Sequence, residues 1–272
     1  MMTSRFLRHL LLLLCLSVIA ACANTGYNPF YNQPGKDVVW WPTSKGVADT
    51  MLDMAKVTPD DYVIDLGSGD GRLVIAAAKR GTRALGIEYN PDLVVLSQGN
   101  AAKEGVDDKA RFVQGDLFES DFSEATVITM FLSPAINLKL RPRILSLKPG
   151  TRVVSNTWTL GEWRPDQTTT VDEREGCGAY CTAYLWIVPA NVEGTWKLPQ
   201  DELTLKQAFQ TFSGTLKSKA TTLPVTDGRL NGDLLSFSVG GTTYSGRVSG
   251  SAMQGTFTSG GNTAPWSATR NP

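Results

Sequence analysis

The sequence predicts an open α/β fold with a doubly wound sheet, followed by a small all-β domain. Three observations lead to this prediction. Between residues 61 and 156, short apolar runs typical of buried parallel strands alternate with segments of helical spacing. A glycine-rich turn, GSGDG at 67–71, joins the first apolar run to the first helix after it. From about residue 191, helical periodicity disappears and short alternating segments rich in Gly, Ser and Thr replace it.

Hydrophobic spacing predicts each element of the α/β domain. Helical spacing at residues 47–55 precedes the first strand. The expected strands are 62–66, 83–87, 111–114, 126–131 and 151–157, the expected helices are 73–80, 93–104 and 136–147, and 168–175 with 179–188 should form a closing antiparallel hairpin. Ser133 and Pro134 are expected to cap and start the last helix, and Pro142 should kink it.

The second domain is expected to be a meander or small barrel. Its short segments begin with recurring tripeptides, GTW at 194, GTL at 214, GRV at 246 and GTF at 255. This spacing predicts about six or more strands. The expected domain bounds are therefore 38–190 for the α/β domain and 191–272 for the β-rich domain.

The amino terminus is typical of an export signal. Arg5 and Arg8 precede an apolar run at 10–21, which is short for a bilayer span. Ile-Ala-Ala-Cys, ending at Cys22, resembles a bacterial lipobox. Residues 1–22 are therefore predicted to be a signal peptide with a lipobox, which implies an exported protein held at the bacterial cell envelope by lipid on Cys22. An uncleaved membrane anchor is the alternative.

Residues 23–37, rich in Asn, Gly, Pro and Tyr, are expected to be a surface tether. The only histidine, His9, lies in the leader, so the processed chain would have neither a histidine-activated nucleophile nor a histidine-bound metal. No metal site is predicted. Loss of Arg5 and Arg8 leaves 26 − 2 = 24 basic residues against 26 acidic ones, a balance that does not indicate a nucleic-acid partner.

Two cysteines remain free of the leader and the lipobox. Of the four in the chain, Cys15 lies in the leader and Cys22 in the lipobox, which leaves Cys177 and Cys181. Two thiols cannot make a four-thiolate metal site. In an oxidising compartment they can close a small disulfide loop, and otherwise they stay as two thiols in a hairpin; the sequence leaves both open.

The glycine turn predicts a nucleotide-type cofactor. Gly67, Gly69 and Gly71 allow a close backbone approach, and Glu88, which ends the second strand, is placed to bind two ribose hydroxyls. Arg72 stands where a dinucleotide motif needs its third glycine, which argues against a nicotinamide enzyme. The negative charge of Asp65 and its neighbour Asp70 suits the sulfonium and ammonium of S-adenosylmethionine better than a pyrophosphate. S-adenosylmethionine is therefore the predicted cofactor.

Residues 37–166 resemble the class I S-adenosylmethionine-dependent methyltransferases, which have a Rossmann-like sheet. The likeness is nearest to a bacterial group related to small protein-lysine methyltransferases. It is carried by Trp41-Pro42-Thr43, Ala55-Lys56-Val57, Asp65 to Arg72, Gly86-Ile87-Glu88, Gly115 to Phe118, Leu147 to Gly150 and Gly161 to Asp166. One departure follows the fifth expected strand, where relatives often carry a histidine and this chain has Asn156.

The resemblance implies a role for each site residue. Cofactor binding would involve Trp41, Thr43, Asp65, Gly67, Ser68, Gly69, Glu88, Asp116 and Leu117: Glu88 at the ribose, Asp116 and Leu117 at the adenine edge, and Asp65, Gly67 and Gly69 at the methionine part. The catalytic candidates are Ser133 and Pro134, in a loop at 131–134 whose carbonyl groups would orient an amine, while Trp41 or Trp158 would face the cationic centre. Core packing and helix capping are the alternative roles for that loop and those tryptophans.

The resemblance also implies methyl transfer to an unidentified acceptor, either a protein lysine or another, small-molecule amine. An in-line displacement needs alignment and a deprotonated nucleophile more than a dedicated base. The alternative function is a non-catalytic envelope lipoprotein that binds a nucleoside-like ligand and interacts with partners.

Overall fold

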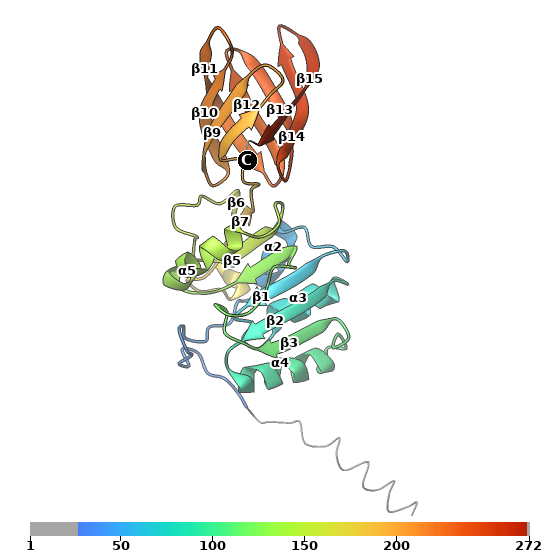
Figure 1. The fold of residues 1–272 in the computed structure, drawn as a ribbon. Coiled ribbons are helices and arrows are strands. Elements are labelled where there is room, and N and C mark those ends of the chain that lie inside the picture. Colours follow the sequence, from blue (N-terminus) through green and yellow to red (C-terminus); the bar gives the residue numbers. More distant parts are fainter. Residues whose placement is uncertain (1–26, 271–272) are drawn as a thin grey trace, which may run out of the picture.

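The computed structural model describes residues 27–270 as an α/β domain followed by a closed β-barrel (Figure 1). The predicted signal peptide, the lipobox residue Cys22 and the first part of the expected tether lie outside these residues. Within 27–270, no helix is both long and apolar enough to cross a membrane.

The α/β domain contains a seven-stranded sheet in the order β3-β2-β1-β4-β5-β7-β6. Its strands are β1 Tyr62–Leu66, β2 Arg83–Glu88, β3 Ala110–Gln114, β4 Val127–Met130, β5 Arg152–Asn156, β6 Gln167–Thr170 and β7 Thr182–Ile187. The first five are parallel, and β7 runs antiparallel to both β5 and β6. The doubly wound sheet predicted from the sequence is confirmed, and the carboxyl ends of its parallel strands meet at one edge.

Helices cover both faces of this sheet. On one face, α2 Lys45–Met54, α3 Arg72–Lys79 and α4 Pro91–Lys103 share a core with β-strand residues such as Val63; on the other, α5 Pro134–Leu145 packs with Ile64. The faces alternate because successive strand residues point in opposite directions. Ser133 caps α5 and Pro134 is its first residue, as predicted, while Pro142 lies inside this one continuous helix.

The closing hairpin is shorter than predicted. Its first strand, β6, ends at Thr170 and does not continue to residue 175. Residues 171–181 instead form a loop that contains the 3₁₀ turn η1, Glu173–Glu175. The threonines at 168–170 fit a strand, but Gly176 and Gly178 adopt positive φ and turn the chain. Cys177 and Cys181 are joined by a disulfide, whereas the sequence left open whether they form one or stay as two thiols.

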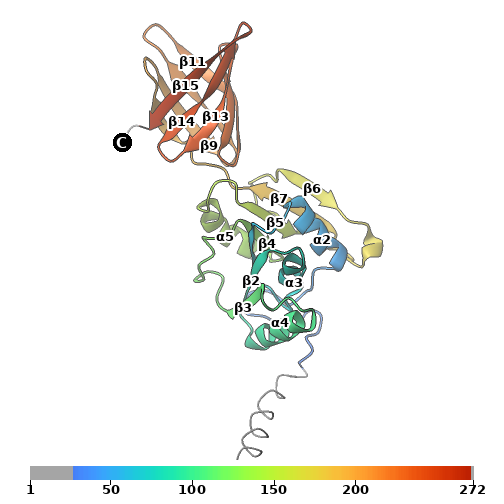
Figure 2. The same ribbon diagram turned by 90° about the vertical axis from the view of Figure 1, so that its right-hand side faces the viewer.

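The carboxy-terminal domain is an eight-stranded antiparallel meander that closes into a barrel (Figure 2). Its strands are β8 Gly194–Lys197, β9 Glu202–Ala208, β10 Thr211–Lys217, β11 Thr222–Asn231, β12 Leu234–Val239, β13 Thr242–Ser249, β14 Ala252–Ser259 and β15 Asn262–Arg270. Trp196, Phe237 and Trp266 help to fill the interior. Closure depends on two residue pairs between β15 and β8, Thr269 with Lys197 and Arg270 with Trp196.

The barrel contacts the α/β domain at the edge of the sheet opposite the parallel strands' carboxyl ends. Phe209, between β9 and β10, stacks on the buried Trp163 with 6.0 Å between ring centroids. Gln210 Nε2 donates to the carbonyl oxygen of Arg164 at 2.8 Å. Gly232 lies so close to Gly150 that an added Cβ would be 3.0 Å from the Gly150 Cα atom. Because Gly150 precedes the amino end of β5, the barrel does not contribute to a site at the carboxyl ends.

Candidate active site

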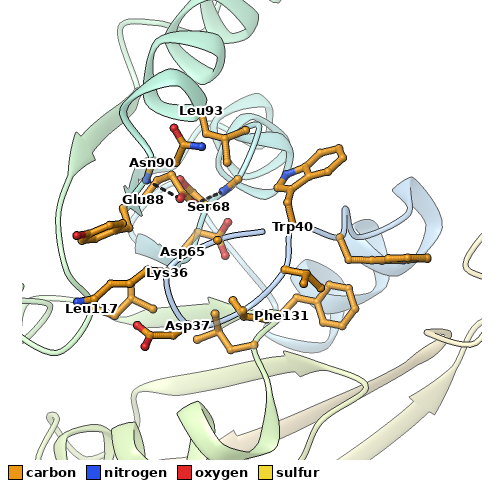
Figure 3. Close-up of a pocket in the computed structure, with 18 of the residues that line it drawn as sticks. Lys36, Asp37, Trp40, Asp65, Ser68, Glu88, Asn90, Leu93, Leu117 and Phe131 are labelled. Carbon is orange, nitrogen blue, oxygen red and sulfur yellow. Dashed lines mark hydrogen bonds between the residues drawn. The ribbon is translucent and has the colours of Figure 1, made fainter. Parts of the chain in front are cut away.

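A cleft lies at the carboxyl ends of β1, β2 and β4, and its empty space, together with the open solvent at its mouth, is about 1020 Å³ (Figure 3). All nine residues proposed from the sequence as cofactor contacts line it: Trp41, Thr43, Asp65, Gly67, Ser68, Gly69, Glu88, Asp116 and Leu117. They come from the segment before α2, the end of β1 and the glycine turn after it, the end of β2 and the chain after β3. Open α/β sheets place their ligands at this edge.

The glycine turn needs its glycines for backbone conformation. Gly67, Gly69 and Gly71 have φ values of +78°, +55° and +84°, in the left-handed region that side chains disfavour. At Gly69 a Cβ would also lie 2.9 Å from Trp40 Nε1. The backbone N–H of Gly67 donates to the Ile87 carbonyl oxygen at 2.9 Å, which fixes the turn against β2.

Arg72 has a structural role at the position of the missing third glycine. Its guanidinium donates to both carboxylate oxygens of Asp70, at 2.9 and 2.5 Å, and to the carbonyl oxygen of Thr43 at 2.8 Å. Arg72 therefore ties the glycine turn to the segment that precedes α2. This side chain explains in physical terms why the turn departs from the dinucleotide pattern.

Glu88 is arranged to bind two hydroxyl groups. Its Oε2 accepts a hydrogen bond from the Gly69 backbone N–H and its Oε1 accepts one from the Asn90 backbone N–H, both at 2.9 Å (Figure 3). These bonds fix the orientation of the carboxylate, while each oxygen keeps a further lone pair. Glu88 can therefore accept hydrogen bonds from the adjacent hydroxyls of a ribose without losing its own partners.

Asp65 is a buried carboxyl group, and no cationic side chain of residues 27–270 acts on its charge. It is 3% exposed, and its Oδ1 accepts a hydrogen bond from Thr129 Oγ1 at 2.6 Å. Burial raises the pKa of Asp65 to about 7, and the negative charges of Glu88 and Asp70 act in the same direction. A cationic ligand in the cleft would stabilise the ionised form. Asp65 and Glu88, both lining the cleft, fit a ligand that carries an ammonium or sulfonium together with a ribose.

Residues 33–43 form a strap along the cleft, where the sequence suggested a tether up to residue 37. Trp40 N–H donates to the Gln33 carbonyl oxygen at 2.9 Å, which closes the strap into a short bridge. Lys36 pairs with Asp116, and its ammonium lies 4.8 Å from the Tyr89 ring centroid. The hydrogen bond from Lys36 lowers the pKa of Asp116. Composition could not reveal this docking, because Gly, Pro and Asn suit both a tether and a packed loop.

The predicted catalytic loop is only partly in the cleft. Phe131 and Leu132 line it, whereas Ser133 and Pro134 are not among its lining residues. Ser133 Oγ instead accepts the Ile136 backbone N–H at 3.4 Å as the cap of α5. Trp158 also lies outside the cleft lining, and Trp41 lies within it. Of the two tryptophans expected to face a cationic centre, the cleft therefore includes Trp41.

Among the cleft residues that sequence reasoning missed are Lys36, Trp40 and Asn90. Asn90 both caps α4 and binds Glu88 through its backbone N–H. Its capping role was readable from the Asn-Pro pair that starts the helix. Trp40 could have been predicted as a cleft residue because it is next to Trp41 in the sequence. Lys36 could not, because only its charge distinguishes it.

Comparisons with known proteins agree on methyl transfer. A family described as the ANTKMT methyltransferase domain matches residues 65–167. A protein-lysine N-methyltransferase from Saccharolobus islandicus is 42% identical over 154 residues, covering 56% of this chain and 94% of that protein. The adenine nucleotide translocase lysine N-methyltransferase of Mus musculus is 36% identical over 105 residues, 38% of this chain and 46% of the relative.

A solved structure matches the same part of the chain. An RNA methyltransferase from Salinibacter ruber, in complex with S-adenosyl-L-homocysteine, is 48% identical with a TM-score of 0.52. The match covers 56% of this chain and 96% of that one. Its bound ligand is the product that S-adenosylmethionine leaves after methyl transfer, and the cleft described above has the residues to hold that donor.

Proposed function

We propose that this chain, which belongs to the class I S-adenosylmethionine-dependent methyltransferases, acts on the side-chain amine of a protein lysine. The observation that supports methyl transfer most directly is that Glu88 and Asp65 line the same cleft. The lysine acceptor is supported by the Saccharolobus islandicus relative, a protein-lysine N-methyltransferase that the match covers over 94% of its length.

The charge of the chain favours a lysine over RNA, the acceptor class in the name of the Salinibacter ruber protein. The sequence has 26 basic and 26 acidic residues, with no excess of positive charge. Proteins that bind RNA depend largely on Lys and Arg for contact with phosphates. Near the cleft, the loop between β6 and β7 carries Asp172, Glu173 and Glu175 against one base, Arg174. An acidic loop repels RNA and attracts a lysine.

The residues of the cleft align the reactants. The bound donor supplies a methyl group on a positively charged sulfur. Glu88 would hold the ribose hydroxyls and Asp65 would face positive charge on the methionine part, which would fix the donor in the cleft. The acceptor lysine attacks as the neutral amine: its lone pair forms the new C–N bond, the C–S pair stays on sulfur, and the amine's proton leaves to water. Loss of the ammonium proton to water has to precede the attack, because the protonated lysine has no lone pair to donate.

Export of the chain is a second proposal. It is supported by the leader pattern ending at Cys22 and by the Cys177–Cys181 disulfide, since such bonds persist in oxidising compartments. Mass spectrometry of the purified protein from its host tests this proposal. A diacylated Cys22 at the amino terminus is the expected result, and an intact Met1 in the cytosolic fraction contradicts it.

The acceptor class is tested with a methyl-labelled donor. The chain would be incubated in parallel with poly-L-lysine and with total RNA, and the products hydrolysed and identified. We expect labelled methyllysine and unlabelled RNA. Label in RNA contradicts the lysine proposal, and label in neither, combined with tight donor binding, favours the non-catalytic binding function. The Glu88→Ala variant is the control for transfer that depends on the cleft.

A further inference from the structure

Four aromatic rings meet at one end of the donor cleft. Trp41 lies edge-on to Tyr180, with 5.3 Å between ring centroids, and Phe131 lies edge-on to Tyr180 at 5.3 Å. Tyr31 is edge-on to Trp41 at 5.2 Å. We call Tyr31, Trp41, Phe131 and Tyr180 the aromatic rim. Trp41 is 39% exposed and Tyr31 64%, so the rim is not part of a closed core.

The rim is built from parts of the chain that are distant in sequence. Trp41 comes from the strap and Phe131 from the end of β4, and both line the cleft. Tyr180 comes from the loop between β6 and β7. Glu175 of this loop packs against the start of α2, where a Cβ added to Gly46 would lie 2.9 Å from the Glu175 Cβ. The loop thus lies beside the strap, at the Phe131 end of the cleft.

The disulfide holds Tyr180 in place. It joins Cys177 to Cys181, the residue directly after Tyr180, and both half-cystines are buried in the core that α2 shares with the sheet. Tyr180 N–H also donates to the Cys177 carbonyl oxygen at 2.9 Å. The ring is therefore presented by a small covalently closed loop whose base is fixed in the core.

The loop has the charge that an amine ligand requires. Asp172, Glu173 and Glu175 stand against a single base, Arg174, which pairs with Asp172 at 2.6 Å. Lys45, on the neighbouring helix, is paired with Asp49 at 2.6 Å. Aromatic faces attract ammonium and methylammonium groups and also pack against the methylene chain of a lysine.

From this geometry we propose that Trp41, Phe131 and Tyr180 form the binding site for the lysine side chain of the acceptor, with Tyr180 positioned by the Cys177–Cys181 loop. The inference rests on the proposed function and deepens it by locating the acceptor site. Phe131 and Trp41 would border the reacting amine, while Tyr180 closes the site on the side away from the donor. The acidic loop would attract the surrounding basic segment of the acceptor protein.

The site is tested with a capped lysine, Nα-acetyl-lysine methylamide, added to the chain loaded with S-adenosyl-L-homocysteine. Its dissociation constant is measured by ligand-observed NMR, the KM for poly-L-lysine by labelled methyl transfer, and donor affinity by calorimetry. We expect Tyr180→Ala to raise both the amine dissociation constant and KM about tenfold with donor affinity unchanged. Tyr180→Phe, which keeps the ring, should stay within about twofold of the original chain.

Two further variants separate the site from general disruption. Trp158→Ala removes an exposed ring outside the cleft lining and should leave the amine constant unchanged. Cys177→Ala/Cys181→Ala frees the loop and should weaken amine binding about threefold, because Tyr180 remains but is no longer held. An equal loss in Trp158→Ala and Tyr180→Ala, or a loss of donor affinity in Tyr180→Ala, overturns the proposal.

The same data distinguish failure of the site from failure of the proposed function. If the original chain methylates lysine with a KM that does not depend on Tyr180, the function stands and the site assignment is wrong. If the chain binds the capped lysine through Tyr180 but transfers no methyl group to lysine, the site stands and the proposed function is wrong. Absence of capped-lysine binding to the original chain also overturns the site.

Discussion

The two domains differ in what they bury. In the α/β domain, polar side chains such as Asp61, Asp65, Ser68, Thr129 and Asn156 are buried. In the barrel, every buried side chain among residues 194–270 is apolar. Burying a polar group is costly unless it finds partners. The barrel interior is therefore apolar over residues 194–270, whereas the α/β domain keeps polar groups in its interior for other purposes.

Two buried carboxyl groups of the α/β domain show what those purposes are. Burial alone would raise the pKa of Asp61, but hydrogen bonds from Thr58, Thr126 and Arg152 lower it. Asp65 has one such partner and a pKa raised to about 7. Asp61 is thus satisfied within the protein and has a structural role. Asp65, at the cleft, is left for a ligand, and the difference separates a structural acid from a binding acid.

The largest effect is expected from a substitution in the barrel core. Trp196→Ala removes a fully buried ring whose Nε1 donates to the Val192 carbonyl oxygen at 2.8 Å. We expect the barrel to lose about 3–5 kcal/mol of unfolding free energy, measured by urea denaturation, with donor affinity unchanged by calorimetry. A parallel loss of donor affinity contradicts the separation of roles between the domains.

A smaller effect is expected in the cleft. Glu88→Ala removes the acceptor for the Gly69 and Asn90 backbone N–H groups and for the donor's hydroxyls. We expect donor affinity to fall about a hundredfold, which corresponds to about 3 kcal/mol. The matched control is Glu202→Ala, an exposed acid on β9 of the barrel. Unchanged donor affinity in Glu88→Ala would remove the assignment of Glu88 to the ribose.

The smallest effect is a pH dependence that comes from Asp65. With a pKa of about 7, its carboxyl group is largely protonated at pH 6 and ionised at pH 8, and a cationic donor favours the ionised form. Donor affinity should therefore rise about tenfold from pH 6 to pH 8 in calorimetric titrations. Asp65→Asn, which keeps the acceptor for Thr129, should bind weakly and with little pH dependence.

Asp65 also makes the free energy of unfolding of the ligand-free protein depend on pH. The folded pKa of Asp65 lies above its ordinary value of 3.8, so the unfolded chain holds fewer protons at this site between about pH 4 and pH 7. Its contribution to the free energy of unfolding therefore falls as pH rises through that window. Asp65→Asn should remove this decline. A decline that persists in the variant assigns it to other groups.

The sequence predicted most of the α/β domain because its signals are local. Apolar runs gave the strands to within a few residues, GSGDG with Glu88 gave part of the cleft, and the family resemblance gave Trp41, Thr43, Asp116 and Leu117. What it missed depends on distant contacts. The pairing of Lys36 with Asp116 spans 80 residues, and Tyr180 meets Trp41 only after the whole sheet has formed. Barrel closure likewise needs β15 to reach β8, so the sequence left meander and barrel open.

The seam between β15 and β8 has a mechanical consequence. β15 is the last strand among residues 27–270, and it is held to β8 by two residue pairs but to β14 by eight, from Ala252 with Thr269 to Ser259 with Asn262. Tension on the carboxyl end therefore loads the weaker seam first. Once that seam parts, β15 peels from β14 one pair at a time, a geometry that resists force far less than shearing all pairs together.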